Sequence, residues 1–227
     1  MSAPLPTLEV LCPLCSATFE SFRPGVDGRT YLSCPQCQFI QLERAHHLSP
    51  QKQKERYLQH DNSRANQGYV VMLQAFIDQA VTPYMKPGGR ILDFGSGPVP
   101  VLAELLGEGG YSVETYDLFF QKDEAYRDRQ YDLVLLVEVL EHLSDPQATL
   151  KALVPRLTPG GAISLMTLFH PNDRRQFADW WYRRDPTHVG FFTAKTLEEM
   201  GKGLGLTPLF TDSKNLMVLG KSHTRLE

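Results

Sequence analysis

The chain has 227 residues, of which 42% are hydrophobic and 22% are charged, and its formal net charge is −3 at pH 7. These values are typical of one globular domain with a small appendage, and the charge does not indicate a phosphate-binding face. No apolar run reaches the roughly 18 residues that a membrane span requires. The segment from Met1 to Leu11 lacks a secretory signal pattern, so we expect a cytoplasmic protein with no membrane partner.

Four cysteines near the start of the chain form two C-x-x-C pairs, with the segment 16–33 between the pairs: Cys12, Cys15, Cys34 and Cys37. Four thiolates in this pattern predict a closed structural Zn²⁺ site, with no open position for catalysis. Disulfides are disfavoured in a chain without an export signal. Segments 19–22 and 31–32 predict two short strands joined by a turn at 26–28. We therefore expect a zinc ribbon over residues 1–44, stabilised by the metal.

Residues 45–67 are polar and carry His46, His47 and His60. No carboxylate or cysteine pattern accompanies these histidines, so we interpret them as solvated residues of a linker and helix. From Gly68 to Met85 apolar residues recur at helical intervals. This pattern predicts a helix that packs on the sheet of a domain spanning residues 68–227.

A glycine turn follows the first predicted strand of that domain. Residues 91–97 are ILDFGSG, and apolar residues at helical spacing follow at 101–106. Glycines allow a sharp turn from strand to helix and a close approach of a ligand to the main chain. A second strand, 111–116, is followed by Asp117, a carboxylate suited to accept the hydroxyls of a ribose.

Strands and helices continue to alternate along the chain. An apolar run at 131–138 is typical of a buried parallel strand, and a helix at 146–157 and a strand at 162–168 follow it. A helix at 193–204 then precedes a closing hairpin formed by 207–211 and 215–220. The order predicts an α/β fold with a Rossmann-like, doubly wound sheet and an antiparallel C-terminal hairpin.

The segments LDFGSG, YDLVLLVEVLEH and LTPGG, with Asp117 after the second strand, resemble the motifs of class I S-adenosylmethionine-dependent methyltransferases over about residues 68–221. The resemblance implies a seven-stranded sheet. It also implies that Asp93, Gly95 and Gly97 surround the methionine part of the cofactor and that Asp117 binds its ribose. A dinucleotide dehydrogenase is disfavoured by Asp93 and by the EVLEH and PGG segments.

Two features depart from the family pattern. Val99 stands where the family often has a third glycine. Only the segment 118–131 separates Asp117 from Asp132, which leaves little room for a third strand and helix. The acidic partner of adenine is then undefined, and Asp123 is a weak candidate that fits a surface loop better.

Methyl transfer requires an aligned nucleophile and, for a hydroxyl or thiol acceptor, a base. Glu138 follows a strand and is expected to face the cofactor pocket, where it is both a cofactor-binding and a catalytic candidate. His142 is a second candidate base. Glu141 and His142 fit equally well as the first residues of the next helix.

An aromatic insert, WWYRRDPTHVGFFT, occupies residues 180–193. Its DPTHVGFFT part resembles a segment of bacterial methyltransferases of the methyltransferase-domain type that also carry an N-terminal zinc ribbon. His188 is a third candidate base, and the aromatic rings with Arg183 and Arg184 are candidates to hold a flat or anionic acceptor. Lid packing and a structural histidine explain the same residues equally well.

The sequence therefore predicts an S-adenosylmethionine-dependent methyltransferase with structural zinc, whose acceptor is a small molecule or RNA. The order of ribbon and catalytic domain also resembles the bacterial ribosomal RNA guanine methyltransferases, although their zinc-ligand spacing differs. The alternative is a non-catalytic protein, in which the ribbon contacts RNA or a protein partner and the cofactor fold is a scaffold. The presence of Asp93, Gly95, Gly97 and Asp117 disfavours that alternative.

Overall fold

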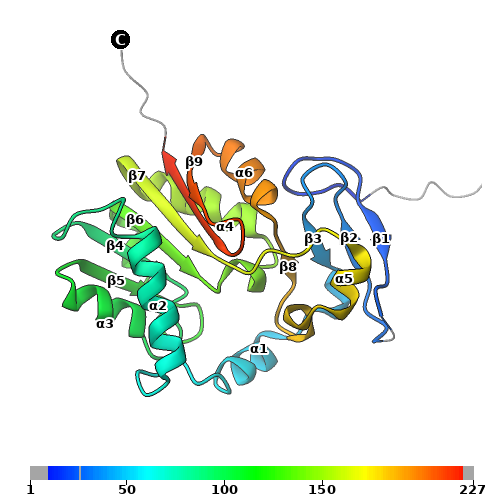
Figure 1. Ribbon diagram of the computed structural model, residues 1–227, viewed down its shortest axis with the longest axis horizontal. Helices are drawn as coiled ribbons and strands as arrows, with labels where there is room; N and C mark the ends of the chain where they lie inside the picture. Colours follow the sequence, from blue (N-terminus) through cyan, green and yellow to red (C-terminus); the bar gives the residue numbers. More distant parts are fainter. Residues whose placement is uncertain (1–9, 26, 222–227) are drawn as a thin grey trace, which may run out of the picture.

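The computed structural model describes residues 10–25 and 27–221, so Val26 of the predicted turn lies outside the described residues. Figure 1 shows two sheets that lie beside each other. The strands of the larger sheet, in spatial order, are β5 (Ser112–Tyr116), β4 (Arg90–Phe94), β6 (Tyr131–Val137), β7 (Leu157–Met166), β10 (Leu216–Lys221) and β9 (Leu206–Thr211). The first four strands are parallel, and β10 is antiparallel to both β7 and β9. The predicted α/β fold with antiparallel C-terminal strands is confirmed.

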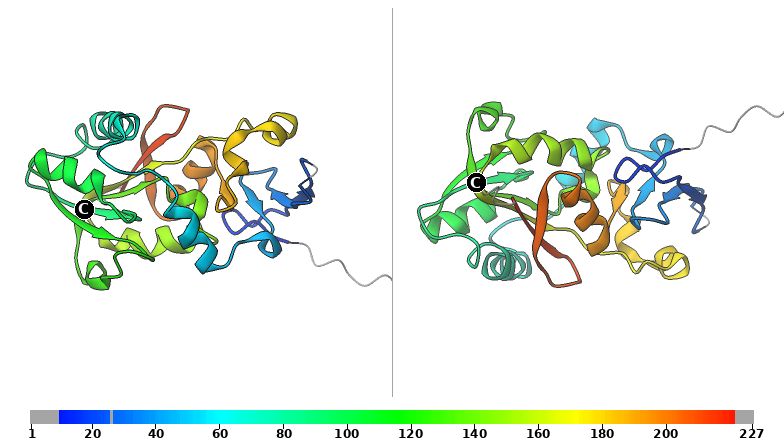
Figure 2. Two further views of the ribbon diagram at one scale, coloured as in Figure 1. Left: turned by 90° about the horizontal axis from the view of Figure 1, so that it is seen from below. Right: turned by 90° about the horizontal axis from the view of Figure 1, so that it is seen from above.

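Helices cover both faces of the larger sheet (Figure 2). Helices α2 (Gln67–Ala80) and α3 (Val101–Glu108) share one apolar core with Leu133 and Leu135 of β6. Helices α4 (Pro146–Leu153) and α6 (Ala194–Lys202) share the other with Val134 and Leu136. Alternate residues of a strand point to opposite faces, which explains why β6 is apolar from Leu133 to Val137.

The predicted count of seven strands is wrong for the part of the chain that the structure describes, where the larger sheet has six. The segment between β5 and β6 forms a short 3-10 helix, η2 (Glu124–Asp128), in place of a strand and helix. A crossover between parallel strands needs about a dozen residues in addition to the strand itself. The short segment therefore leaves β5 as the edge strand.

The smaller sheet has the order β1 (Glu20–Phe22), β2 (Tyr31–Ser33), β3 (Ile40–Leu42) and β8 (Gly190–Phe191). The first two strands were predicted, whereas β3 was not. Strand β8 comes from the aromatic insert and pairs with β3, so the insert completes the sheet of the cysteine-rich module. Behind the sheet, the fully buried rings of Tyr31, Phe177 and Phe191 pack edge to face. The module thus shares its core with a segment that is distant in the chain.

Helix α1 (Pro50–Tyr57) lies at the lower edge of the view in Figure 1, below the junction of the two sheets. It begins at Ser49, whose side chain accepts the Lys52 N–H, with Pro50 in the first helical position. Arg56 near its end donates to Asp185 of the insert at 2.8 Å. The remaining short elements are η1 (Arg44–His46), η3 (Leu140–His142), η4 (Val154–Arg156), α5 (Arg174–Asp179) and η5 (Trp181–Arg184). Among the described residues, no helix has the length and apolar character that crossing a membrane requires.

Candidate functional site

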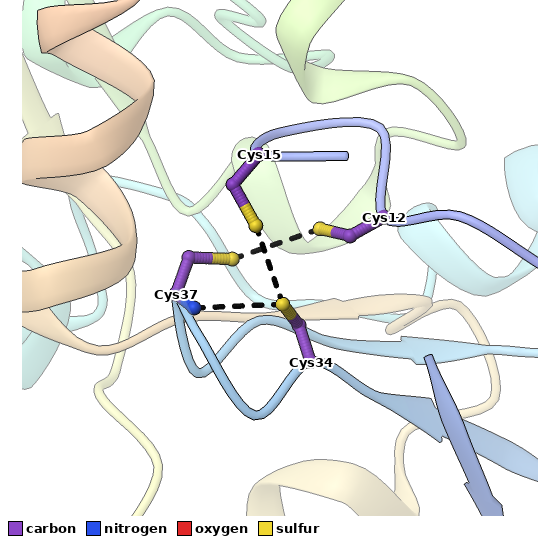
Figure 3. A group of neighbouring side chains, drawn as sticks. All are labelled: Cys12, Cys15, Cys34 and Cys37. Carbon is purple, nitrogen blue, oxygen red and sulfur yellow. Dashed lines mark hydrogen bonds between the residues drawn. The ribbon is translucent and has the colours of Figure 1, made fainter. Parts of the chain in front are cut away.

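The four cysteines converge at one point of the module (Figure 3). Their Sγ atoms all lie within 4.8 Å of one another, with 3.6 Å between Cys12 and Cys37 and 3.4 Å between Cys15 and Cys34. A tetrahedral Zn²⁺ with Zn–S bonds of about 2.3 Å places its sulfurs about 3.8 Å apart, whereas a disulfide requires about 2.05 Å. The sulfur cluster therefore fits a tetrahedral metal and contains no disulfide.

The cysteine cluster is joined to the main domain by contacts at the start of α6. The Thr196 hydroxyl donates to the Cys37 carbonyl at 2.9 Å, and the rings of Phe39 and Phe192 lie 5.2 Å apart. Two of the linker histidines, predicted to be solvated, contact the protein: Nε2 of His47 lies 2.9 Å from the Leu42 carbonyl, and Nε2 of His60 lies 3.7 Å from Oδ2 of Asp185.

The glycine turn after β4 requires its two glycines for different reasons. Gly95 has a φ of +88°, and a Cβ at this position would lie 2.4 Å from Cγ2 of Val139. Gly97 has a φ of +71°, but no atom lies within 4 Å of the position of its absent Cβ. Close packing therefore excludes a side chain at Gly95, and backbone conformation disfavours one at Gly97.

Asp117 closes this turn from the end of β5. Its Oδ2 accepts the Gly97 N–H at 3.0 Å, and its Oδ1 accepts the N–H groups of Phe119 and Phe120 at 2.7 and 3.1 Å. A carboxylate offers about four acceptor positions, so Asp117 retains capacity for a further donor on Oδ2. A ribose hydroxyl is suited to that position.

Asp93 lies buried at the carboxyl end of β4, with 3% of its surface exposed. Its Oδ2 has no hydrogen-bond partner. Burial, and secondarily the negative charge of Asp117, raises the pKa of Asp93 to about 7. An ammonium group beside Asp93 would supply both the missing donor and the compensating charge, so the site fits the methionine part of S-adenosylmethionine.

The two departures from the family pattern have different outcomes. The Val99 side chain is 42% exposed, so it does not obstruct the glycine turn. Asp123 caps η2, because its Oδ1 accepts the Ala125 N–H at 2.9 Å, and it is exposed. Local capping accounts for Asp123 without a role in binding adenine.

Glu138 follows β6 in a left-handed conformation, with a φ of +55° that side chains rarely adopt. Its Oε2 lies 3.0 Å from the Tyr182 hydroxyl, and that hydroxyl also lies 2.7 Å from Oε1 of Glu141. One hydroxyl proton cannot serve both contacts, so a second proton is shared. Burial and the charge of Glu141 raise the pKa of Glu138 well above its usual range. The role of Glu138 as a catalytic and cofactor-binding residue stays a prediction.

The other two predicted bases, His142 and His188, lie together with Glu141. The two imidazole rings are 4.8 Å apart, and Nε2 of His142 is 3.9 Å from Oε1 of Glu141. His142 is brought there by η3, which follows β6 directly, and the Asp185 side chain shapes the turn before His188 by accepting the Thr187 N–H at 2.9 Å. Glu141 and His142 are therefore the last two residues of the 3-10 turn η3, and they do not begin the next helix, which starts at Pro146.

Three tyrosines at the site were not identified from the sequence. Tyr182 bridges the two glutamates, and the ring of Tyr57 contacts that of His142 at 5.0 Å. Burial and the charges of Asp93 and Glu138 raise the pKa of Tyr69 to about 12. Tyr69 thus lies near both the glycine turn and the glutamates. These tyrosines belong to α1, α2 and η5, and no local pattern marks them.

The two neighbouring arginines of the insert have different surroundings. Arg183 is buried, and its guanidinium donates to Asp27 at 2.8 Å and to the carbonyl of Ala178. Arg184 donates to the Asp179 carbonyl at 3.2 Å. The hypothesis that Arg183 holds an anionic acceptor is therefore wrong, because its charge is already neutralised by Asp27 of the cysteine-rich module.

Comparison with known proteins identifies one family that the chain matches and several solved structures with a similar fold. The ubiquinone biosynthesis O-methyltransferase of Salmonella arizonae is 35% identical over 77 residues, which cover 34% of this chain and 32% of that protein. An O-methyltransferase family protein from Burkholderia thailandensis superposes with a TM-score of 0.53 at 14% identity, over 76% of this chain and 63% of that one. The magnesium protoporphyrin IX methyltransferase of Synechocystis PCC 6803 superposes with a TM-score of 0.51 at 13% identity, over 79% and 95%.

These structures share the fold of this chain, but their sequence identities are too low to assign their substrates to it. The chain spans about a third of the length of the curated relatives that it matches. The family model for a methyltransferase domain matches residues 58–209, which is more than half of the chain. The chain therefore belongs to the methyltransferase domain family and contains a class I S-adenosylmethionine-dependent methyltransferase domain.

Proposed function

We propose that this protein transfers the methyl group of S-adenosylmethionine to a small molecule, and that Asp93, Gly95, Gly97, Asp117 and Glu138 form the cofactor site. The observation that carries the proposal is the buried, unpartnered Oδ2 of Asp93 beside a glycine turn. A lone buried carboxylate is costly unless a cation or donor reaches it. The cofactor, when bound, supplies an electrophilic methyl group on a sulfonium, and the protein binds and orients the two reactants.

Charge favours a small molecule over RNA as the acceptor. Buried carboxyl groups gather at the carboxyl ends of β4, β5 and β6: Asp93, Asp117, Glu138 and Glu141. A phosphate backbone needs unpaired arginine or lysine side chains. One arginine of the insert and one of α1 are already paired, Arg183 with Asp27 and Arg56 with Asp185.

The insert offers apolar and aromatic surface for such an acceptor. A hollow of about 520 Å³ is lined by both insert tryptophans and by Phe169 and Pro171, which follow β7. Trp181 is 65% exposed there, and the ring of Trp180 lies 5.1 Å from that of Tyr182, which contacts Glu138. Exposed aromatic rings suit a flat, largely apolar acceptor.

His142 and His188 are the proposed bases for an acceptor hydroxyl. The Nδ1 of each ring faces a backbone carbonyl, at 3.1 Å for His142 and 2.7 Å for His188. A carbonyl only accepts, so Nδ1 carries the proton and Nε2 is left to receive one. Zn²⁺ is proposed at Cys12, Cys15, Cys34 and Cys37, where it would stabilise the module and take no part in the transfer.

Calorimetric titration with S-adenosylmethionine tests the cofactor site. Asp117→Ala should weaken binding at least tenfold, because it removes the acceptor of the ribose and of the Gly97 N–H. Asp123→Ala is the matched control: its carboxylate caps η2 on the surface, so binding should be unchanged. No binding by the wild type at millimolar cofactor would favour a non-catalytic scaffold.

The acceptor is tested by release of S-adenosylhomocysteine from the cofactor. Hydroxylated aromatic compounds should stimulate release, whereas total RNA should not. Stimulation by RNA alone, with saturable RNA binding at physiological salt, would overturn the choice of a small molecule and restore RNA as the acceptor.

A further inference from the structure

Glu141, His142 and His188 form a second group of metal-ligand side chains. One ligand atom from each of the three lies within 4.8 Å of the others. Two of the residues follow β6 and the third comes from the insert. A backbone hydrogen bond just before β8 holds the two segments together, because the Val189 N–H donates to the Glu141 carbonyl at 2.7 Å. The group is therefore created by the fold and is separate from the cysteine cluster.

The two imidazoles are oriented as metal-bound imidazoles usually are. His142 donates from Nδ1 to the Thr187 carbonyl, and His188 donates from Nδ1 to the Tyr182 carbonyl. Metal-binding histidines generally donate their second ring N–H to a carbonyl or carboxylate, which fixes the tautomer and the ring plane. Nε2 of each ring is therefore unprotonated, and none of the hydrogen bonds described for His142 and His188 supplies a donor to its lone pair.

Glu141 supplies an independent observation that points to a cation. Its side chain is fully buried, its Oε1 accepts from Tyr182, and its Oε2 has no partner. The group thus brings together hydrogen-bond acceptors, and no side chain in it donates a hydrogen bond to Oε2 of Glu141. Such an arrangement is costly without a positive charge between its members.

Another buried histidine, which follows β7, shows the contrast. His170 is 4% exposed, its Nε2 donates to the Gln38 carbonyl at 2.8 Å, and its Nδ1 accepts the Asn172 N–H at 3.0 Å. Backbone groups use both of its nitrogens, so His170 has a purely structural explanation. His188, which is buried to a similar extent, has no such explanation for its Nε2.

We infer that Glu141, His142 and His188 bind one divalent transition-metal cation, with coordination positions left for water or acceptor. Two imidazoles and one carboxylate are a common three-ligand set for catalytic Zn²⁺ and for open first-row metal sites. This inference rests on the proposed methyl transfer and changes one part of it: with the metal bound, the two imidazoles are ligands in place of bases, and an acceptor hydroxyl bound at the metal would lose its proton to solvent more readily. Its oxygen would then bond the methyl carbon as the sulfur–carbon bond breaks, leaving a thioether.

The experiment uses the full chain with its cysteine site loaded with zinc and weakly bound metal removed by brief chelation. Mn²⁺ is the probe because it prefers nitrogen and oxygen ligands to thiolates. Electron paramagnetic resonance of free Mn²⁺ should show one bound equivalent. Glu141→Gln and His142→Asn should each weaken binding at least tenfold, whereas His170→Asn should leave it unchanged.

Circular dichroism of each variant checks that a loss of metal binding is not caused by unfolding. His142→Asn is the mildest change, because the His142 side chain is partly exposed. No saturable binding of Mn²⁺ or of a second Zn²⁺ would overturn the inference, as would binding that both ligand variants retain. S-adenosylmethionine binding is measured on the same chelated protein. If the cofactor binds and the metal does not, this inference fails alone; if the cofactor does not bind, the proposed function fails.

Discussion

The two groups of metal-ligand residues differ in how the chain builds them. The cysteines come from two C-x-x-C pairs within the short segment 12–37, and four sulfurs enclose one point. Glu141 and His142 meet His188 only because the Val189 N–H bonds the Glu141 carbonyl and joins the insert to η3, and three ligands leave one side open. A site whose protein ligands fill every coordination position stabilises a fold, whereas a site with an open position can bind and activate a substrate. We therefore expect changes in the first group to alter folding and changes in the second to alter ligand binding.

The largest expected effect is that of Cys37→Ser on stability. This substitution removes a buried ligand between β2 and β3, and structural Zn²⁺ contributes on the order of 10 kcal/mol in isolated zinc modules. The variant should lose its zinc, and its free energy of unfolding should fall by several kcal/mol. Metal analysis and thermal unfolding measure both effects. Unchanged melting of a zinc-free variant would show that packing against the insert suffices.

A smaller loss is expected at the glycine turn, where the two glycines provide a matched pair. Gly95→Ala introduces a Cβ that would lie 2.4 Å from Val139 in a backbone with a φ of +88°, so we expect a loss of about 2–4 kcal/mol. Gly97→Ala meets only the backbone penalty of about 1–2 kcal/mol, because no atom lies within 4 Å. Urea unfolding compares the two. Equal losses would show that Val139 moves aside.

Features that depend on neighbouring residues in the chain were predicted from the sequence. The cysteine pairs, the turn with Asp93 and Asp117, and the buried strand β6 each lie within a short segment whose chemistry or periodicity is explicit. The sequence also showed that too little chain separates β5 from β6, although the resemblance still suggested seven strands. The conflict was decided by length, since the segment between Asp117 and Asp132 is too short to supply a strand and a crossover helix.

Features that depend on distant segments were not predicted. The pairing of β3 with β8 involves two residues on one side, too few for any periodicity to appear. The partners of Glu141 are equally invisible, because Tyr182 is 41 residues away and reaches it through the folding of the insert. Arg183 was misassigned for the same reason: its partner Asp27 is 156 residues distant.

The next prediction concerns pH and separates the cofactor site from the rest of the fold. The pKa of Asp93 is raised to about 7 in the folded protein and is near 4 when unfolded. Between these pH values only the folded state holds the proton, so stability falls as pH rises from about 4 to 7. Asp93→Asn should remove this loss and be more stable than the wild type by on the order of 4 kcal/mol at pH 8, since each pKa unit corresponds to about 1.4 kcal/mol, with no gain near pH 4.

Thermal melting of both proteins across this pH range is the measurement, and S-adenosylmethionine should stabilise the wild type at pH 8 much more than Asp93→Asn. A variant that is less stable than the wild type at every pH would contradict the view that an uncompensated carboxylate is held for the cofactor.

The smallest effect is expected from the ion pair that ties α1 to the insert. Arg56 donates to Asp185 from two nitrogens at 3.0 and 2.8 Å, and the arginine side chain is 35% exposed. Solvent screening limits the pair, so Arg56→Ala should cost about 1 kcal/mol. Arg64→Ala is the control, because Arg64 pairs with Glu108 on the open surface and its loss should leave the melting temperature unchanged. Since Asp185 also shapes the turn that carries His188, Arg56→Ala should weaken Mn²⁺ binding slightly while Arg64→Ala does not; equal Mn²⁺ affinities in the two variants would show that the turn holds His188 without help from α1.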